Sequence, residues 1–155
     1  MTALLDGMGV RWAKAGALAA LEYRAEPRFT TDADILVSWD DRLPAQLTDA
    51  GYTVKAMADP GEPPHLLLTR TATDRVDLLV ACTEYQDLAL ERAIDGVLTV
   101  EDVIVHKLLA WRPRDRGDLR SILDVGHDLD VAYIEHWAEQ WEVLDRWREL
   151  GGSTI

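Results

Sequence analysis

The sequence has few of the features that mark secreted, disulfide-bonded or membrane-spanning proteins. Its single cysteine, Cys82, excludes a disulfide within the chain. No apolar run approaches the roughly 20 residues that a membrane span requires. Residues 1–10 have no basic segment ahead of an apolar core, as a secretory signal would. These absences predict a cytoplasmic protein without a membrane segment, in which Cys82 is a small buried hydrophobe.

Positive charge is also scarce, with 16 Lys and Arg against 28 Asp and Glu and a net charge of −12. An acidic protein repels a polyanion, so general coating of nucleic acid is disfavoured. Basic residues nevertheless gather just after Lys107, at Arg112, Arg114, Arg116 and Arg120. This arginine cluster either binds a phosphate-bearing ligand or forms a solvated helix end that pairs with Asp115 and Asp118.

Composition and periodicity predict one folded domain, because 48% of the 155 residues are apolar and 28% are charged. Strands are predicted at residues 13–17 (as a strand or tight turn), 34–39, 52–57, 65–70 and 75–81. Helices are predicted at residues 18–24, 44–50, 84–94, 99–111, 115–125 and 131–142. Thr99 and Asp102 form a predicted capping box at the start of the helix at 99–111. We therefore expect an α+β fold over residues 1–155, with a sheet core at about 10–82 and a helical part at about 84–150.

Three aspartates stand where they could bind a metal ion. Asp32 and Asp34 are two apart at the start of a predicted strand, so their side chains share one face. Asp77 interrupts an otherwise apolar strand. Convergent carboxylates repel one another, and Mg²⁺, which prefers oxygen ligands, would relieve the repulsion. In the structural alternative Asp32 caps a turn, Asp34 is solvated, and Asp77 pairs with Arg75 or Arg70.

The order of these motifs resembles the signature of the nucleotidyltransferase superfamily. A small-residue turn at residues 15–17 precedes Asp32-Ala33-Asp34 at a strand start, and residues 75–79 are similar to the strand that carries a third carboxylate. Residues 101–118 resemble the helices of its AbiEii-like branch, which includes toxins of toxin–antitoxin systems. The resemblance covers roughly residues 10–140. It implies a nucleotidyltransferase fold with a small mixed sheet flanked by helices and a helical C-terminal half.

The resemblance also implies a chemistry and assigns residues to it. Two Mg²⁺ ions would be held by Asp32, Asp34 and Asp77, and Lys107 would contact the triphosphate or Asp118. Four residues would contribute to nucleotide binding, namely Gly16, Ala17, Arg28 and Asp118. The family turn carries Gly-Gly or Gly-Ser, whereas Ala17 offers only its backbone amide. Gly16 could instead serve packing, Arg28 could stabilise a turn, and Asp118 could form a surface salt bridge.

Two functions follow from these observations. In the first, a metal-dependent nucleotidyltransferase moves a nucleotide from a nucleoside triphosphate to an RNA or protein hydroxyl, as the toxin-like part of a toxin–antitoxin system. In the second, a catalytically degenerate nucleotidyltransferase fold binds a cognate partner protein or forms a homodimer. The stripe of Tyr133, Trp137 and Trp141 is predicted to pack in the core, with a partner surface as its alternative.

Overall fold

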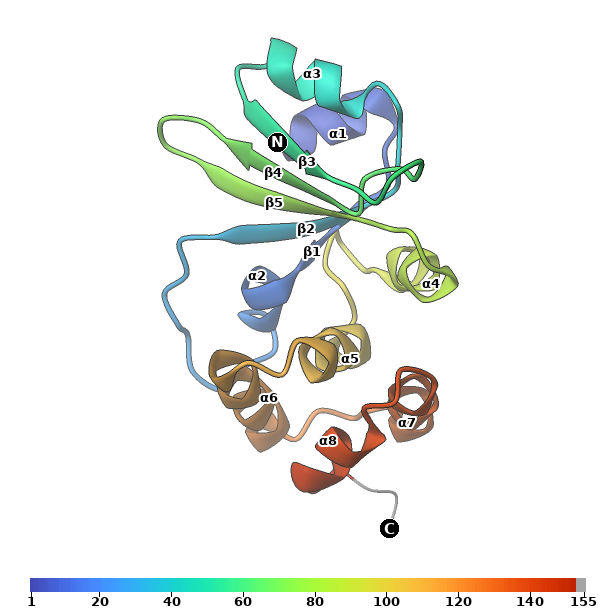
Figure 1. The fold of residues 1–155 in the computed structure, drawn as a ribbon. Helices are drawn as coiled ribbons and strands as arrows, with labels where there is room; N and C mark the ends of the chain where they lie inside the picture. Colours follow the sequence, from blue (N-terminus) through green and yellow to red (C-terminus); the bar gives the residue numbers. More distant parts are fainter. Residues whose placement is uncertain (153–155) are drawn as a thin grey trace.

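A five-stranded sheet with helices on both faces forms the centre of the computed structural model, which describes residues 1–152 (Figure 1). The strands are β1 (Trp12–Ala15), β2 (Ala33–Val37), β3 (Thr53–Met57), β4 (Leu66–Arg70) and β5 (Arg75–Val80). Their order across the sheet is β1-β2-β5-β4-β3, with β2 and β5 parallel and the other neighbours antiparallel. The α+β class and the mixed sheet are thus confirmed.

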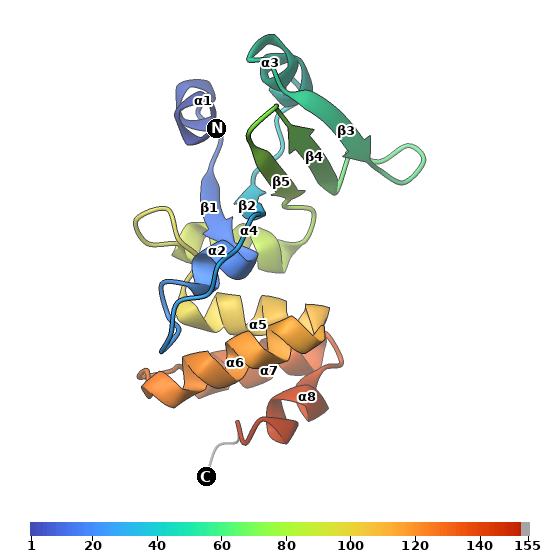
Figure 2. The ribbon, with the colours of Figure 1, turned by 90° about the vertical axis from the view of Figure 1, so that its left-hand side faces the viewer.

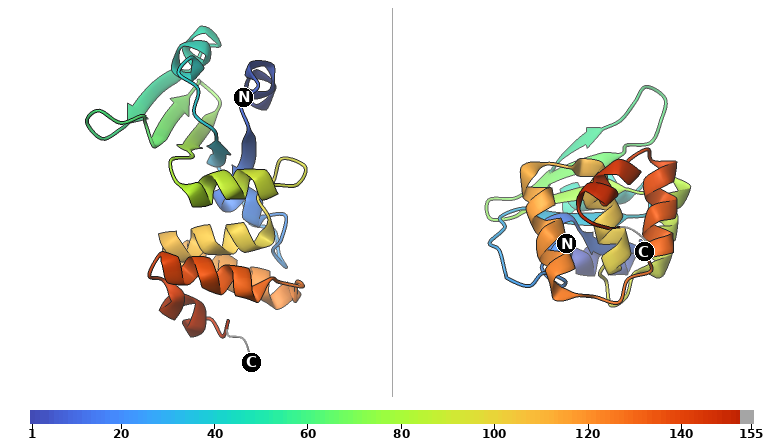
Figure 3. Two further views of the ribbon diagram at one scale, coloured as in Figure 1. Left: turned by 90° about the vertical axis from the view of Figure 1, so that its right-hand side faces the viewer. Right: turned by 90° about the horizontal axis from the view of Figure 1, so that it is seen from below.

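The helices are divided unequally between the two faces. The short helices α1 (Thr2–Met8) and α3 (Leu43–Asp49) cover one face (Figure 2). On the other side lie α2 (Gly16–Ala20), α4 (Glu84–Arg92), α5 (Val100–Ala110), α6 (Pro113–Val125), α7 (Val131–Gln140) and α8 (Leu144–Glu149), with α6 to α8 farther from the sheet (Figure 3). The helical C-terminal half is therefore confirmed, whereas α1 and α8 were not predicted.

Alternating side chains on the central strands separate two apolar cores. On β2, Ile35 and Val37 belong to the core beneath α1 and α3, and Leu36 belongs to the core on the side of α5. On β5, Val76, Leu78 and Val80 likewise face α1 and α3. Because neighbours along a strand point to opposite faces, Asp34 and Asp77 lie on the side of α5. The two carboxylates therefore face the helical half of the chain.

Asp102 holds the helical side together. Thr99 caps α5 by accepting a hydrogen bond from the Asp102 amide, as the sequence predicts. The Asp102 carboxylate is fully buried and also accepts hydrogen bonds from Thr99 Oγ1 at 2.7 Å, Tyr85 Oη at 3.1 Å, Tyr133 Oη at 2.7 Å and Arg92 Nε at 3.2 Å. The residue predicted as the capping-box partner of Thr99 therefore anchors α4, α5 and α7 to one another.

The aromatic stripe packs mainly in the core. Trp137 packs against buried Tyr85 with ring centroids 4.7 Å apart and the rings tilted by 46°, and Tyr133 packs beside Trp137. Among residues 1–152, no helix combines the length and apolar character needed to cross a bilayer. The prediction for Cys82 is wrong: this residue is exposed, because it follows β5 at the turn into α4.

Candidate active site

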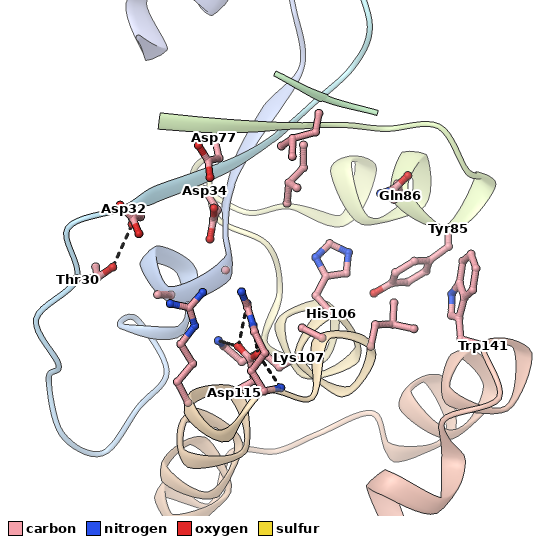
Figure 4. Close-up of a pocket in the computed structure, with 18 of the residues that line it drawn as sticks. Thr30, Asp32, Asp34, Asp77, Tyr85, Gln86, His106, Lys107, Asp115 and Trp141 are labelled. Atoms are coloured by element: carbon pink, nitrogen blue, oxygen red, sulfur yellow. Dashed lines mark hydrogen bonds and ion pairs between the residues drawn. The ribbon is translucent and has the colours of Figure 1, made fainter. Parts of the chain in front are cut away.

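A pocket of about 610 Å³ lies between the helical side of the sheet and helices α5 and α6 (Figure 4). It brings together residues from both halves of the chain. Seven of the eight predicted site residues line it, namely Gly16, Ala17, Arg28, Asp32, Asp34, Asp77 and Lys107. The eighth, Asp118, lies behind the wall and contacts Lys107.

Asp34 and Asp77 are directly opposed on the parallel strands β2 and β5. Asp32 precedes β2, and its half-exposed carboxylate lies 3.9 Å from Arg75 Nε. Arg70 Nη1 donates to Asp77 Oδ1 at 2.7 Å, which is the pairing of the structural alternative. Within residues 1–152, no group of three or more His, Cys, Asp or Glu side chains is arranged to hold a metal ion. The three carboxylates thus share a pocket but do not converge on one point.

Negative charge at this end of the pocket is only partly compensated. Burial raises the pKa of Asp34, and the neighbouring Asp77 carboxylate raises it further, whereas Arg112 and Arg114 act in the opposite direction. A raised pKa means that the surroundings disfavour the carboxylate charge. A divalent cation would remove this penalty, and the available donors are the oxygen ligands that Mg²⁺ prefers. The carboxylate oxygens of these aspartates are therefore chemically suited to bind such an ion.

Gly16 lies directly against Asp34. Its φ is +55°, in the region that favours glycine, and a Cβ at this position would lie 2.0 Å from Asp34 Oδ2. Alanine at this position would therefore force the Asp34 side chain to move. The glycine is required by close packing against the carboxylate, and it leaves the start of α2 open to the pocket beside Ala17.

The opposite wall of the pocket carries a buried ion cluster. Lys107, with 3% of its surface exposed, donates to Asp115 Oδ1 at 3.1 Å and to Asp118 Oδ2 at 2.7 Å. Asp118 also pairs with Arg24 and, at 3.2 Å, with Arg28. Asp118 is therefore a buried centre of three cations and not the surface salt bridge of the alternative interpretation. Arg24 was missed, because a lone arginine after a short helix gives no local signal.

The arginine cluster contributes both structure and charge. Arg112 Nε donates to Asp115 Oδ2 at 2.6 Å. Burial raises the pKa of Asp115, but hydrogen bonds and charge from Arg112 and Lys107 outweigh this effect and lower it. Arg114 lines the pocket, and Arg116 lies over the Trp111 ring. In this wall the two carboxylates of Asp115 and Asp118 are surrounded by four cations, which are Lys107, Arg112, Arg24 and Arg28. The wall therefore carries excess positive charge facing the acidic strands.

The other end of the pocket is aromatic and was not predicted. Tyr85, Gln86, His106 and Trp141 line it (Figure 4). His106 meets the Tyr85 ring edge-on with centroids 5.6 Å apart. Burial lowers the pKa of His106; Asp102 opposes this shift, and Lys107 adds to it. The only available sequence signal was Trp141, the last member of the aromatic stripe.

No protein-family model and no curated protein sequence matches the chain. Solved structures do resemble it. The antibiotic-resistance factor ANT(2'')-Ia in solution is 18% identical, with 97% of this chain and 90% of that chain covered and a TM-score of 0.59. ANT(2'')-Ia in complex with adenylyl-2''-tobramycin is 16% identical, with 94% of each chain covered and a TM-score of 0.60. An antigenic nucleotidyltransferase-like protein from Paracoccidioides brasiliensis is 18% identical, with 97% and 88% covered and a TM-score of 0.50. The chain therefore has the nucleotidyltransferase fold.

Proposed function

We propose that this protein transfers a nucleotidyl group from a nucleoside triphosphate to a hydroxyl group. One observation carries the proposal: Asp34 and Asp77 are opposed on parallel strands and face a pocket whose far wall holds Lys107, Arg112 and Arg114. An acidic edge and a cationic wall across one pocket suit a triphosphate accompanied by a divalent cation. The nucleotidyltransferase fold of the similar structures supports the same activity.

Each residue has a role that its surroundings support. Asp32, Asp34 and Asp77 would hold Mg²⁺, which supplies charge neutralisation of the triphosphate and activation of the attacking hydroxyl. Gly16 and Ala17 present an open helix start without bulky side chains, so a phosphate can approach their backbone. Lys107 offsets phosphate charge from the opposite wall. Arg28 can do the same, because Asp118 holds its guanidinium beside the pocket.

Asp77 is the proposed acceptor for the proton of the attacking hydroxyl. Arg70 donates to its Oδ1, and Oδ2 is left as the accepting atom. The leaving pyrophosphate gains negative charge as the bond to the α-phosphorus breaks. Lys107, Arg112 and Arg114 would stabilise that charge from the cationic wall. An RNA or protein hydroxyl as the acceptor, and membership of a toxin–antitoxin system of the AbiEii-like branch, complete the proposal.

A second candidate function is a catalytically degenerate fold that binds a partner protein or forms a homodimer. Two observations favour it. The Arg70 pairing occupies one oxygen of Asp77, and residues 1–152 contain no ready-made group of three metal ligands. The alanine at position 17 adds to this, since the family turn has glycine or serine there.

Calorimetry with each nucleoside triphosphate, with and without Mg²⁺, separates the two functions. The wild type is compared with Asp32→Asn/Asp34→Asn and with Asp145→Asn, whose side chain is 98% exposed and belongs to α8. We expect Mg²⁺-dependent binding by the wild type and by Asp145→Asn, and its loss in the double variant. A folded wild-type protein that binds no triphosphate would contradict the transferase and favour the partner-binding function.

A further inference from the structure

Unpaired positive charge is concentrated on helix α6, outside the pocket. Most Lys and Arg side chains form ion pairs within residues 1–152. In that part of the chain, those that form none are Lys55 on β3, Arg146 on α8, and Arg114, Arg116 and Arg120 on α6. Because the whole chain has a net charge of −12, this local excess of positive charge requires an explanation.

Three arginines form a stripe along α6. Arg112, Arg116 and Arg120 are four residues apart, so they follow one another on one face over roughly 12 Å of the helix axis. This arginine stripe begins at the pocket, which Arg112 lines, and continues along α6 on one flank of the helical half (Figure 3). Arg146 adds a fourth cation, because the guanidinium carbons of Arg116 and Arg146 both lie 5.7 Å from the centroid of the Trp111 ring.

Helix electrostatics disfavours this arrangement of charges. Cations in the first turn of a helix oppose its macrodipole, and like charges four residues apart repel each other. Arg114 and Arg116 are among the first four residues of α6, and Arg116 stands four residues before Arg120. Within residues 1–152, neither Arg116 nor Arg120 has a carboxylate partner that would offset this cost. The charges therefore cost stability in the free protein, and an anionic ligand would remove that cost.

The surroundings of the arginine stripe favour a phosphate backbone over an acidic protein surface. The exposed positions between residues 113 and 120 carry only arginine, proline or glycine. Protein interfaces depend on large aromatic or apolar anchors, which these positions do not supply. A Cβ on Gly117 would meet no atom within 4 Å, so a ligand chain can lie close to the helix. Guanidinium groups bind phosphate oxygens through paired hydrogen bonds, which suits a strand of nucleic acid.

We propose that the arginine stripe docks the phosphate backbone of a single-stranded RNA whose end enters the pocket. A flexible strand can follow one helix and turn into the pocket at Arg112. Contact with a few phosphates on one flank is compatible with an acidic protein that repels polyanions elsewhere. The docking rests on the stripe alone. Only the choice of RNA, as the molecule that supplies the acceptor hydroxyl, rests on the proposed function.

Fluorescence anisotropy with a labelled single-stranded RNA, in EDTA and without nucleotide, measures docking alone. We compare the wild type with Arg116→Gln/Arg120→Gln and with the charge-matched Lys55→Gln/Arg42→Gln, which removes two exposed cations elsewhere. In the stripe variant the affinity at low salt should fall about tenfold, and the slope of log K against log salt should decrease by about 1.4, as for two lost phosphate contacts. The control variant should match the wild type. Urea unfolding should show no loss of stability in the stripe variant, which separates docking from a structural role.

Several binding results would overturn the inference. A wild type that binds no RNA is one, and equal weakening in the two double variants is another, because it would attribute binding to overall charge. Polyglutamate serves as the acidic-protein probe, and tighter binding of polyglutamate than of RNA would assign the stripe to a protein partner. Tighter binding of a single-stranded DNA of the same sequence would refute the choice of RNA.

Transfer of a labelled nucleotide to the same RNA tests the link to the reaction. In the stripe variant the KM for RNA should rise, whereas kcat and the affinity for the nucleoside triphosphate should not change, because Arg116 and Arg120 lie outside the pocket lining. Transfer with an unchanged KM would mean that the acceptor docks elsewhere, against the inference. RNA docking on the stripe without any transfer would contradict the proposed function and leave the docking surface standing.

Discussion

Replacing Asp118 with asparagine should destabilise the protein strongly, although the change is nearly isosteric. The Asp118 carboxylate is 1% exposed and pairs with Lys107, Arg24 and Arg28. Asparagine removes the negative charge and keeps one carbonyl acceptor. Breaking a buried ion pair from one side costs about 3–5 kcal/mol, because the opposite charge is left without compensation.

The lower end of that range applies here. Lys107 keeps Asp115 as a partner, and the Arg24 and Arg28 side chains are 12% and 34% exposed, so water can solvate them in part. We therefore expect Asp118→Asn to lose about 3 kcal/mol of unfolding free energy. At roughly 2–4 °C per kcal/mol for a domain of this size, Tm should fall by about 6–12 °C.

Urea and thermal unfolding measured by circular dichroism check this value. Asp145→Asn is the matched control, because Asp145 is 98% exposed and its ion pair with Arg148, at 3.5 Å, lies at the surface. Its unfolding free energy should stay within about 0.5 kcal/mol of the wild type. A loss below about 1 kcal/mol for Asp118→Asn would refute the view that the buried cluster depends on this carboxylate.

Three further variants test other parts of the structure. Gly16→Ala should still fold, but it should lose about 1 kcal/mol or more of unfolding free energy because Gly16 has a positive φ. Calorimetry should show that it also loses Mg²⁺-dependent triphosphate binding, since the added Cβ forces Asp34 to move. Unchanged binding would contradict the close packing of Gly16 against Asp34. His106→Gln should reduce the stability that the protein loses on acidification. The His106 imidazole of the unfolded wild-type chain takes up a proton near the ordinary pKa of 6.5, whereas that of the folded chain does so only at lower pH. Urea titrations of the wild type and the variant from pH 7.5 to 5 check this, and equal losses of unfolding free energy in the two proteins would contradict it. Tyr133→Phe should cost about 1–3 kcal/mol in urea unfolding by removing a donor to buried Asp102, and a neutral effect would mean that the other donors suffice.

Local patterns predicted the strands and the face on which the aspartates lie. Asp77 in an apolar strand and Asp34 at a strand start were informative because side-chain alternation is a short-range property. The prediction was poorer where helices are short. Helices α1 and α8 span 7 and 6 residues, and neither has a side-chain cap hydrogen bond, so neither periodicity nor a capping motif marks them.

Long-range partners could not be predicted from the sequence. Arg24 and Asp118 are 94 positions apart, and nothing near either residue indicates the other. Asp102 was predicted as the capping-box partner of Thr99, and its amide does donate to the Thr99 side chain, but its burial among Tyr85 and Tyr133 depends on how three helices pack. The exposure of Cys82 has the same origin, because apolar neighbours along the chain do not reveal where a strand ends.

The distribution of the pocket over the chain bears on how the protein matures during synthesis. The acidic strands end at Val80, whereas Lys107 and Arg112 of the opposite wall, and Asp118 behind it, come later in the chain. The strand carboxylates are therefore synthesised first, and Arg24 and Arg28 lack their partner Asp118 until α6 emerges from the ribosome. Until α5 is complete at Ala110, this helix does not cover Ala13, Ala15 and Leu36. We expect nascent chains that end before α5 to need a chaperone, because exposed apolar sheet faces aggregate.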